Sequence, residues 1–109
     1  MEFNYKLNKV ELEKFEAWLM TKNLKTDLDK LLALSYFLEH NQGMSSFNVV
    51  DLETVFRSAK ENPPKNINDA ANKNVGRGYL MEANGKKDSK KAWCLTSSGE
   101  RFVEADKGV

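Results

Sequence analysis

Cys94 and His40 are the two residues whose side chains could act as a nucleophile and its general base. The chain contains one cysteine and one histidine, and a thiol attacks a substrate efficiently only beside a base or with a lowered pKa. Cys94 falls in an expected strand and His40 near the end of an expected helix, where positive charge suits the helix dipole. The sequence also has no GxGxxG pattern and no phosphate-binding loop. We therefore expect no enzyme activity, no cofactor and no metal site, with Cys94 half-buried.

A second set of residues carries the positive charge that nucleic-acid binding requires. Residues 60–91 hold eight Lys or Arg against four Asp or Glu, whereas residues 1–59 hold seven against nine and residues 92–109 two against three. The positive charge thus collects on one segment, although the net charge of the whole chain is only +1. Lysine and arginine bind phosphate, and asparagine can pair with an adenine edge. This segment is the candidate functional surface.

The length and composition limit what can position these residues. A chain of 109 residues that is 40% hydrophobic and 30% charged is typical of one small globular domain. Its longest apolar runs are a few residues, far below the roughly 20 that a membrane-spanning helix needs. The N-terminus lacks the pattern of a secretory signal, and one cysteine permits no internal disulfide. We expect a cytoplasmic protein.

Apolar residues at helical spacing predict most of the elements. Three expected helices have a capping residue, Thr26, Asn48 or Asn66, with an acidic residue three positions later. The first of these three should be central, because its apolar residues extend around most of the cylinder. The full set of expected helices covers residues 8–20, from 26 to about 41–43, from 48 to 59, from 66 to 77, and a last helix that begins after Thr96 or Ser97.

In the helix that starts at Asn66, four residues are expected to face the core: Ile67, Ala70, Ala71 and Val75. Asn74 falls on the same inward stripe, where an apolar residue is usual.

The strands are fewer and shorter. Ser46 and Phe47 are expected to form an isolated strand, and after Gly78 the pattern becomes alternating over residues 79–83 and 92–96. The connecting residues 84–91 contain four lysines, and Asn84-Gly85 signals a turn. This part of the chain therefore predicts a β-hairpin with a lysine-rich tip.

The resulting order of elements resembles the winged helix-turn-helix superfamily over residues 26–104. The residues that carry the resemblance are the turn over residues 62–66, the Gly78-Tyr79-Leu80 step into a strand, and the Leu95-Thr96-x-x-Gly99 segment that closes the wing. The fold class implied is mainly α with a small β-hairpin, that is, a winged helix-turn-helix over residues 26–105 with an additional N-terminal helix within residues 1–25. Residues 106–109 should fray.

The resemblance also implies a function, because DNA-binding members place the second helix of the motif in the major groove and the wing on the backbone. Here that helix would be residues 66–77, and the protein would be a small transcriptional regulator that binds specific double-stranded DNA. The residues at positions matching that interface are Lys65, Asn68, Asn72, Lys73 and Arg77 of the helix region, and Lys86, Lys87, Lys90 and Lys91 of the wing. Asn66 is expected to act as a helix cap.

Two alternatives stay open. A winged helix can also serve as a protein-interaction module without nucleic acid, in which case the lysines are a solvated loop tip. A DNA-binding form should be a homodimer that binds two half-sites, with Phe3, Tyr5, Phe15 and Trp18 at the interface; the other interpretation places these aromatic residues in the core of the monomer.

Overall fold

The computed structural model describes residues 17, 18, 24 and 26–105. Over this part of the chain it has four helices and a three-stranded antiparallel sheet. The elements are α2 (Asp27–His40), β1 (Phe47–Asn48), α3 (Val49–Ser58), α4 (Ile67–Gly76), β2 (Leu80–Glu82), β3 (Ala92–Leu95) and α5 (Ser97–Ala105). The expected N-terminal helix lies outside the described residues except for Ala17 and Trp18, which are helical. The tail over residues 106–109 also lies outside them.

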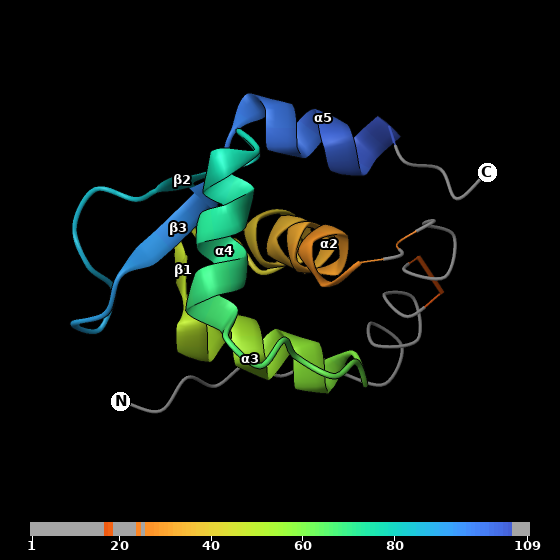
Figure 1. Ribbon diagram of the computed structural model, residues 1–109, viewed down its shortest axis with the longest axis horizontal. Helices are drawn as coiled ribbons and strands as arrows, with labels where there is room; N and C mark the ends of the chain where they lie inside the picture. Colours follow the sequence, from red (N-terminus) through yellow and green to blue (C-terminus); the bar gives the residue numbers. More distant parts are fainter. Residues whose placement is uncertain (1–16, 19–23, 25, 106–109) are drawn as a thin grey trace.

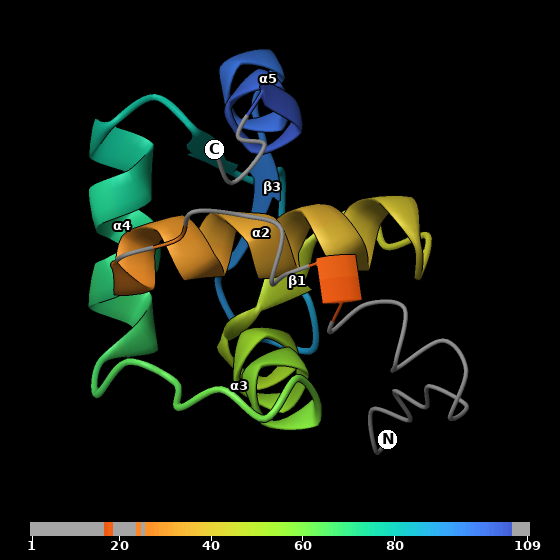
Figure 2. The ribbon, with the colours of Figure 1, turned by 90° about the vertical axis from the view of Figure 1, so that its right-hand side faces the viewer.

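Helix α2 is the centre of the domain, as its apolar pattern predicts. The Thr26 hydroxyl accepts a hydrogen bond from the Asp29 amide at 3.1 Å and so caps the helix. Its buried residues, Leu31, Leu32, Ala33, Leu34, Ser35, Phe37 and Leu38, cover more than one face. Figures 1 and 2 show the reason: α3, α4 and α5 pack around α2 from different sides, and β3 passes beside it.

The sheet has the order β1-β3-β2, with both pairs antiparallel. The expected isolated strand at Ser46 and Phe47 is therefore wrong, because β1 pairs with β3 through the Phe47–Trp93 register. Phe47 and Trp93 are both fully buried, so the pairing brings two aromatic side chains into the core. A pair of strands so distant in sequence gives no local turn signal.

The two expected strands of the hairpin, β2 and β3, are confirmed. The turn between them, however, is not at Asn84-Gly85, where the sequence predicts it. Lys87 and Lys90 exchange backbone hydrogen bonds at 2.9 and 3.0 Å, and the two residues between them, Asp88 and Ser89, have φ of 51° and 63°. These are the values of a two-residue turn in which both residues are left-handed. The tip is thus at Asp88-Ser89, and Gly85, with φ of 79°, lies earlier in the connection.

Helices α3 and α4 are joined by the turn that contains Pro63 and Pro64. Asn48 and Asp51 form a reciprocal capping box at the start of α3, and the Asn66 side chain accepts from the Asp69 amide at 2.9 Å to cap α4. Both caps confirm the sequence expectation.

The inward face of α4 matches the expected one except at Val75. Ala70, Ala71 and Asn74 are buried, whereas Val75 is 38% exposed. The placement of Val75 in the core is therefore wrong, and that of Asn74 on the inward stripe is right.

Helix α5 begins where the Thr96 hydroxyl accepts a hydrogen bond from the Gly99 amide at 2.9 Å. It then packs against α2 and β3, and Gly99 comes so close to the Tyr79 backbone that an added Cβ would overlap the Tyr79 carbonyl oxygen. None of the helices in the described part of the chain combines the length and the apolar character that crossing a bilayer requires.

Candidate nucleic-acid interface

One face of α4 carries two asparagines, Asn68 and Asn72, and a lysine lies just before the helix. Asn68 is exposed, and Lys65, in the turn just before the helix, is exposed as well. No side-chain partner is found for either among the described residues. Asn68 and Asn72 are four residues apart and so lie on one face of the helix. Within the described part of the chain, the Asn68 amide and the Lys65 ammonium are therefore the groups here that have no side-chain partner.

Asn72 fixes the direction of that stripe. Its Oδ1 accepts hydrogen bonds from the Lys91 ammonium at 3.2 Å and from the Trp93 indole N–H at 3.3 Å. Because Lys91 directly precedes β3 and Trp93 lies within it, the Asn72 face of α4 is held against the hairpin. Asn72 therefore helps to fix the position of α4 relative to the hairpin, whether or not it also binds a partner molecule.

Lys73 and Arg77, on the other side of α4, are occupied within the domain. Lys73 forms an exposed ion pair with Asp69 at 3.1 Å. Arg77 donates to Asn74 Oδ1 at 2.9 Å and to Asp29 Oδ1 at 3.0 Å. Its guanidinium also lies 4.9 Å from the Tyr79 ring centroid, so Arg77 joins α4 to α2 instead of projecting freely.

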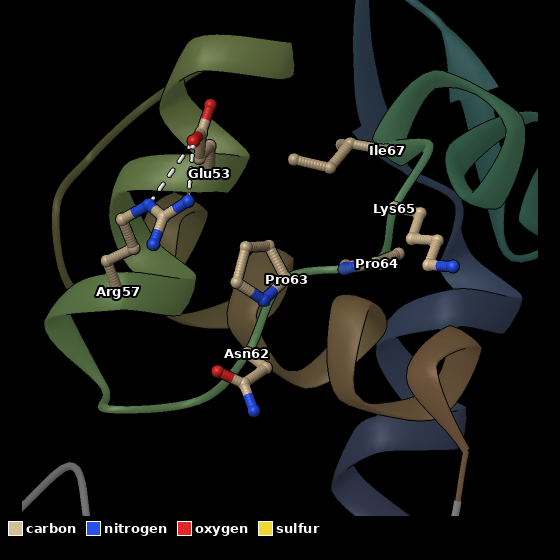
Figure 3. Close-up of a pocket in the computed structure, with 7 residues that line it drawn as sticks. All are labelled: Glu53, Arg57, Asn62, Pro63, Pro64, Lys65 and Ile67. Carbon is tan, nitrogen blue, oxygen red and sulfur yellow. Dashed lines mark hydrogen bonds and ion pairs between the residues drawn. The ribbon is translucent and has the colours of Figure 1, made fainter.

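A cavity of about 370 Å³ lies at the turn between α3 and α4. Figure 3 shows Arg57 directed at Glu53, and the two bond at 3.0 Å, while Lys65 extends from the turn on its own. The rest of the lining consists of an asparagine, two prolines and an isoleucine, and no thiol or imidazole takes part in it. The lining residues are Glu53, Arg57, Asn62, Pro63, Pro64, Lys65 and Ile67.

The four wing lysines differ in their surroundings. Lys87 is partly buried and forms an ion pair with Asp51 at 2.7 Å. Lys91 is bound to Asn72, lies 3.7 Å from a Glu82 oxygen and is 5.7 Å from the Trp93 ring centroid. Lys86 and Lys90 are exposed, and neither has a side-chain partner among the residues described.

The role of Asp51 is one that sequence reasoning missed. The Asn48-x-x-Asp51 spacing predicts the helix cap, but the same carboxylate also binds a lysine 36 residues away. No local pattern carries that contact.

Of the aromatic residues expected at a dimer interface, Phe3, Tyr5 and Phe15 lie outside the described residues. Trp18 is half-buried and stacks on Tyr36, with ring centroids 6.0 Å apart. It packs against the hydrophobic core. This placement agrees with the interpretation in which the aromatic residues complete the monomer core, and it leaves dimer formation a prediction.

A separate polar cluster joins the end of α2 to α5. His40 Nε2 lies 2.9 Å from a Glu100 oxygen, and the ligand atoms of Glu39, His40 and Glu100 lie within 4.8 Å of one another, close enough to hold a metal ion. These atoms also serve the fold, because Glu39 accepts a hydrogen bond from the Leu95 amide at 2.7 Å. Burial raises the pKa of Glu39, against the opposing effect of that hydrogen bond.

Cys94 is half-buried, as expected. Burial, and secondly the negative charge of Glu39, raise the pKa of its thiol. A nucleophilic cysteine needs the opposite shift. The surroundings of Cys94 therefore keep the thiol protonated.

Comparison with known proteins adds no assignment. No protein-family model, curated protein or solved structure matches the chain.

Proposed function

We propose that this protein is a winged helix-turn-helix domain that binds double-stranded DNA, with α4 in the major groove and the hairpin, residues 83–91, on the backbone. The observation that carries the proposal is the hydrogen bonding of Asn72 to Lys91 and Trp93. It joins the face of α4 that carries Asn68 and Asn72 to the last lysine of the hairpin connection, Lys91. A helix that enters the major groove and a hairpin that contacts the DNA backbone need to lie next to each other in this way.

The topology supports the same proposal. Helices α3 and α4 form two short helices joined by a tight turn, and a β-hairpin follows directly. In Figure 1 the hairpin connection projects from the body of the domain beside α4. Both elements are therefore available to a duplex.

The chemistry supports sequence-specific binding in part. An asparagine side chain can pair with an adenine edge through its donor and its acceptor, and neither group of Asn68 has a partner among the described residues. Exposed lysines at positions 65, 86 and 90 supply phosphate contacts. So few contacts would bind one half-site weakly, and a transcriptional regulator of this size would act in the cytoplasm as a homodimer on two half-sites.

The test is fluorescence anisotropy of a labelled mixed-sequence duplex at low and at physiological salt. We expect binding whose log affinity falls linearly with log salt concentration. Lys65→Gln should weaken binding and reduce the slope. Arg101→Gln, an equal charge loss at an exposed position of α5, should change neither by more than the experimental error. Absence of binding by the wild-type protein at low salt would overturn the proposal.

A protein-interaction module is the second candidate, and the exposed apolar residues favour it. Val75 in α4 is 38% exposed and Met81 in β2 is 50% exposed. In addition, Lys73 and Arg77 have their charges occupied by Asp69 and Asp29. If the duplex does not bind, this second candidate is the one to pursue, with Val75→Ser and Met81→Ser as variants in binding assays.

A further inference from the structure

The wing is attached to the body of the domain through an ion pair between a buried carboxylate, Asp51, and a partly buried lysine, Lys87. The Asp51 side chain is only 2% exposed, and its Oδ2 lies 2.7 Å from the Lys87 ammonium. The same oxygen accepts a hydrogen bond from the Asn48 amide at 3.0 Å. The Asn48 side-chain N–H in turn donates to the Lys87 carbonyl oxygen at 3.1 Å. Lys87 is thus held at both its side chain and its backbone by the start of α3.

This position gives Lys87 a different role from that of an exposed lysine. A buried carboxylate without a cation beside it is strongly unfavourable, so the Lys87 charge is needed where it is. The ammonium also lies 3.5 Å from the Ser46 carbonyl oxygen. A phosphate could draw Lys87 away only by leaving Asp51 buried and unpaired.

Lys91 forms a second attachment, at the other strand of the wing. It donates to Asn72 of α4 at 3.2 Å and approaches Glu82 of β2 at 3.7 Å. The wing is therefore tied to α3 by one lysine and to α4 by another. Between these two ties lies the tight turn at Asp88 and Ser89.

We propose that the four wing lysines divide into two functional pairs: Lys87 and Lys91 position the wing, and Lys86 and Lys90 contact the phosphates of a bound duplex. The contact half of this proposal rests on the proposed function, whereas the positioning half does not. A wing that is already ordered loses little conformational entropy on binding, so its exposed ammonium groups bind phosphate at a lower entropic cost than they would on a flexible loop.

The positioning half is tested by amide hydrogen exchange without any nucleic acid. The probes are the Lys87 and Lys90 amides, which bond to each other's carbonyl oxygens. The main variant combines Asp51→Asn with Lys87→Met, because removing both charges leaves no unpaired ion, and an amide oxygen at position 51 can still accept from Asn48. We expect exchange at the two probes to be at least tenfold faster, and unchanged in the matched variants Lys86→Met and Lys90→Met.

Unchanged exchange in the folded double variant, verified by circular dichroism, would overturn the positioning role of Lys87. Lys91→Met provides a second test, because the Lys91 side chain is more exposed and its loss is less disruptive. Here the probe is the Ala83 amide, which donates to the Ala92 carbonyl at 2.9 Å. Faster exchange at Ala83 supports the second attachment, and unchanged exchange overturns it.

The contact half is tested by the salt dependence of duplex binding. Lys86→Met and Lys90→Met should each lower the slope of log affinity against log salt by about 0.9, the loss of one phosphate contact. If the wild-type protein binds and neither variant changes the slope, Lys86 and Lys90 are not the contacts. If the wild-type protein does not bind, the proposed function and the contact half both fail, while the exchange experiment still decides the positioning half.

Discussion

Asn74, in the last turn of α4, donates a hydrogen bond to the backbone carbonyl oxygen of Leu28, in the first turn of α2, at 3.0 Å. The other side of the same amide accepts from Arg77 at 2.9 Å. The Asn74 side chain is fully buried, so both of its polar ends are satisfied inside the domain. Although a buried asparagine is unusual in a hydrophobic core, Asn74 connects α4 to α2 through these hydrogen bonds.

Replacing Asn74 should destabilise the fold. Asn74→Ala leaves the Leu28 carbonyl without its donor and creates a small cavity, and the cost of an unsatisfied buried group is about 1–3 kcal/mol. Urea unfolding followed by circular dichroism measures the change. Asn68→Ala is the matched control, since Asn68 is exposed on the same helix and should change stability by less than about 0.5 kcal/mol. Equal effects of the two substitutions would contradict the assigned role of Asn74.

Gly99 should tolerate no side chain. An added Cβ would overlap the Tyr79 carbonyl oxygen, and forcing that overlap costs about 1–3 kcal/mol or more. Gly99→Ala is therefore expected to lower the urea midpoint clearly. Gly76→Ala is the control, because a Cβ there meets open space at the end of α4, and alanine favours helix by up to about 1 kcal/mol. A neutral Gly99→Ala would mean that α5 does not pack this closely on Tyr79.

Glu39 should make stability depend on pH below neutrality. Burial raises its pKa in the folded chain. A carboxyl group with a raised folded pKa favours folding below its unfolded pKa, and this contribution is lost as the pH rises through the folded pKa. Glu39→Gln keeps an oxygen for the Leu95 amide and removes the titration. The variant should thus be at least as stable as wild type at pH 7, with a weaker gain on acidification, measured by urea unfolding between pH 4 and pH 7, roughly the range of carboxyl titration.

Cys94 should react slowly with alkylating reagents. Its thiol pKa is raised by burial and by the nearby negative charge of Glu39, and the reactive species is the thiolate. The rate of iodoacetamide labelling against pH should have its midpoint above that of a free cysteine. Glu39→Gln should move the midpoint down, because it removes the second cause and leaves the first. A midpoint below the free value would instead indicate an activated thiol and reopen the question of catalysis.

Local sequence signals predicted the helices well and the tertiary contacts poorly. Thr26, Asn48 and Asn66 cap their helices as expected, because a cap depends on residues three positions apart. The ion pair of Lys87 with Asp51, by contrast, joins residues 36 positions apart, and the sequence did not predict it. A contact over that distance depends on how α3 and the hairpin pack, which no local pattern records.

Tertiary contacts also explain two predictions that were wrong: the burial of Val75 in the core and the isolation of the strand at Phe47. Val75 and Asn74 are neighbours in α4, and hydrophobicity alone favours Val75 for the core. The hydrogen bonds of Asn74 to the Leu28 carbonyl of α2 and to Arg77 offset the cost of burying its amide. Asn74 is therefore buried, whereas Val75 is partly exposed. Likewise, the strand at Phe47 was expected because of its local residues, whereas its pairing with Trp93 depends on the whole domain.

The order of the sheet has a further consequence, for self-association. Within the described part of the chain, strand β3 is bonded on both sides, so the edges of the sheet are β1, with two residues, and β2, with three. Edges this short present too few unpaired amides and carbonyls to template a strand from another molecule. A longer edge would form only if β3 lost its pairing with β1 or with β2. Loss of the β1 pairing would separate Phe47 from Trp93, two residues of the core, so the addition of a foreign strand on that side would require part of the core to open.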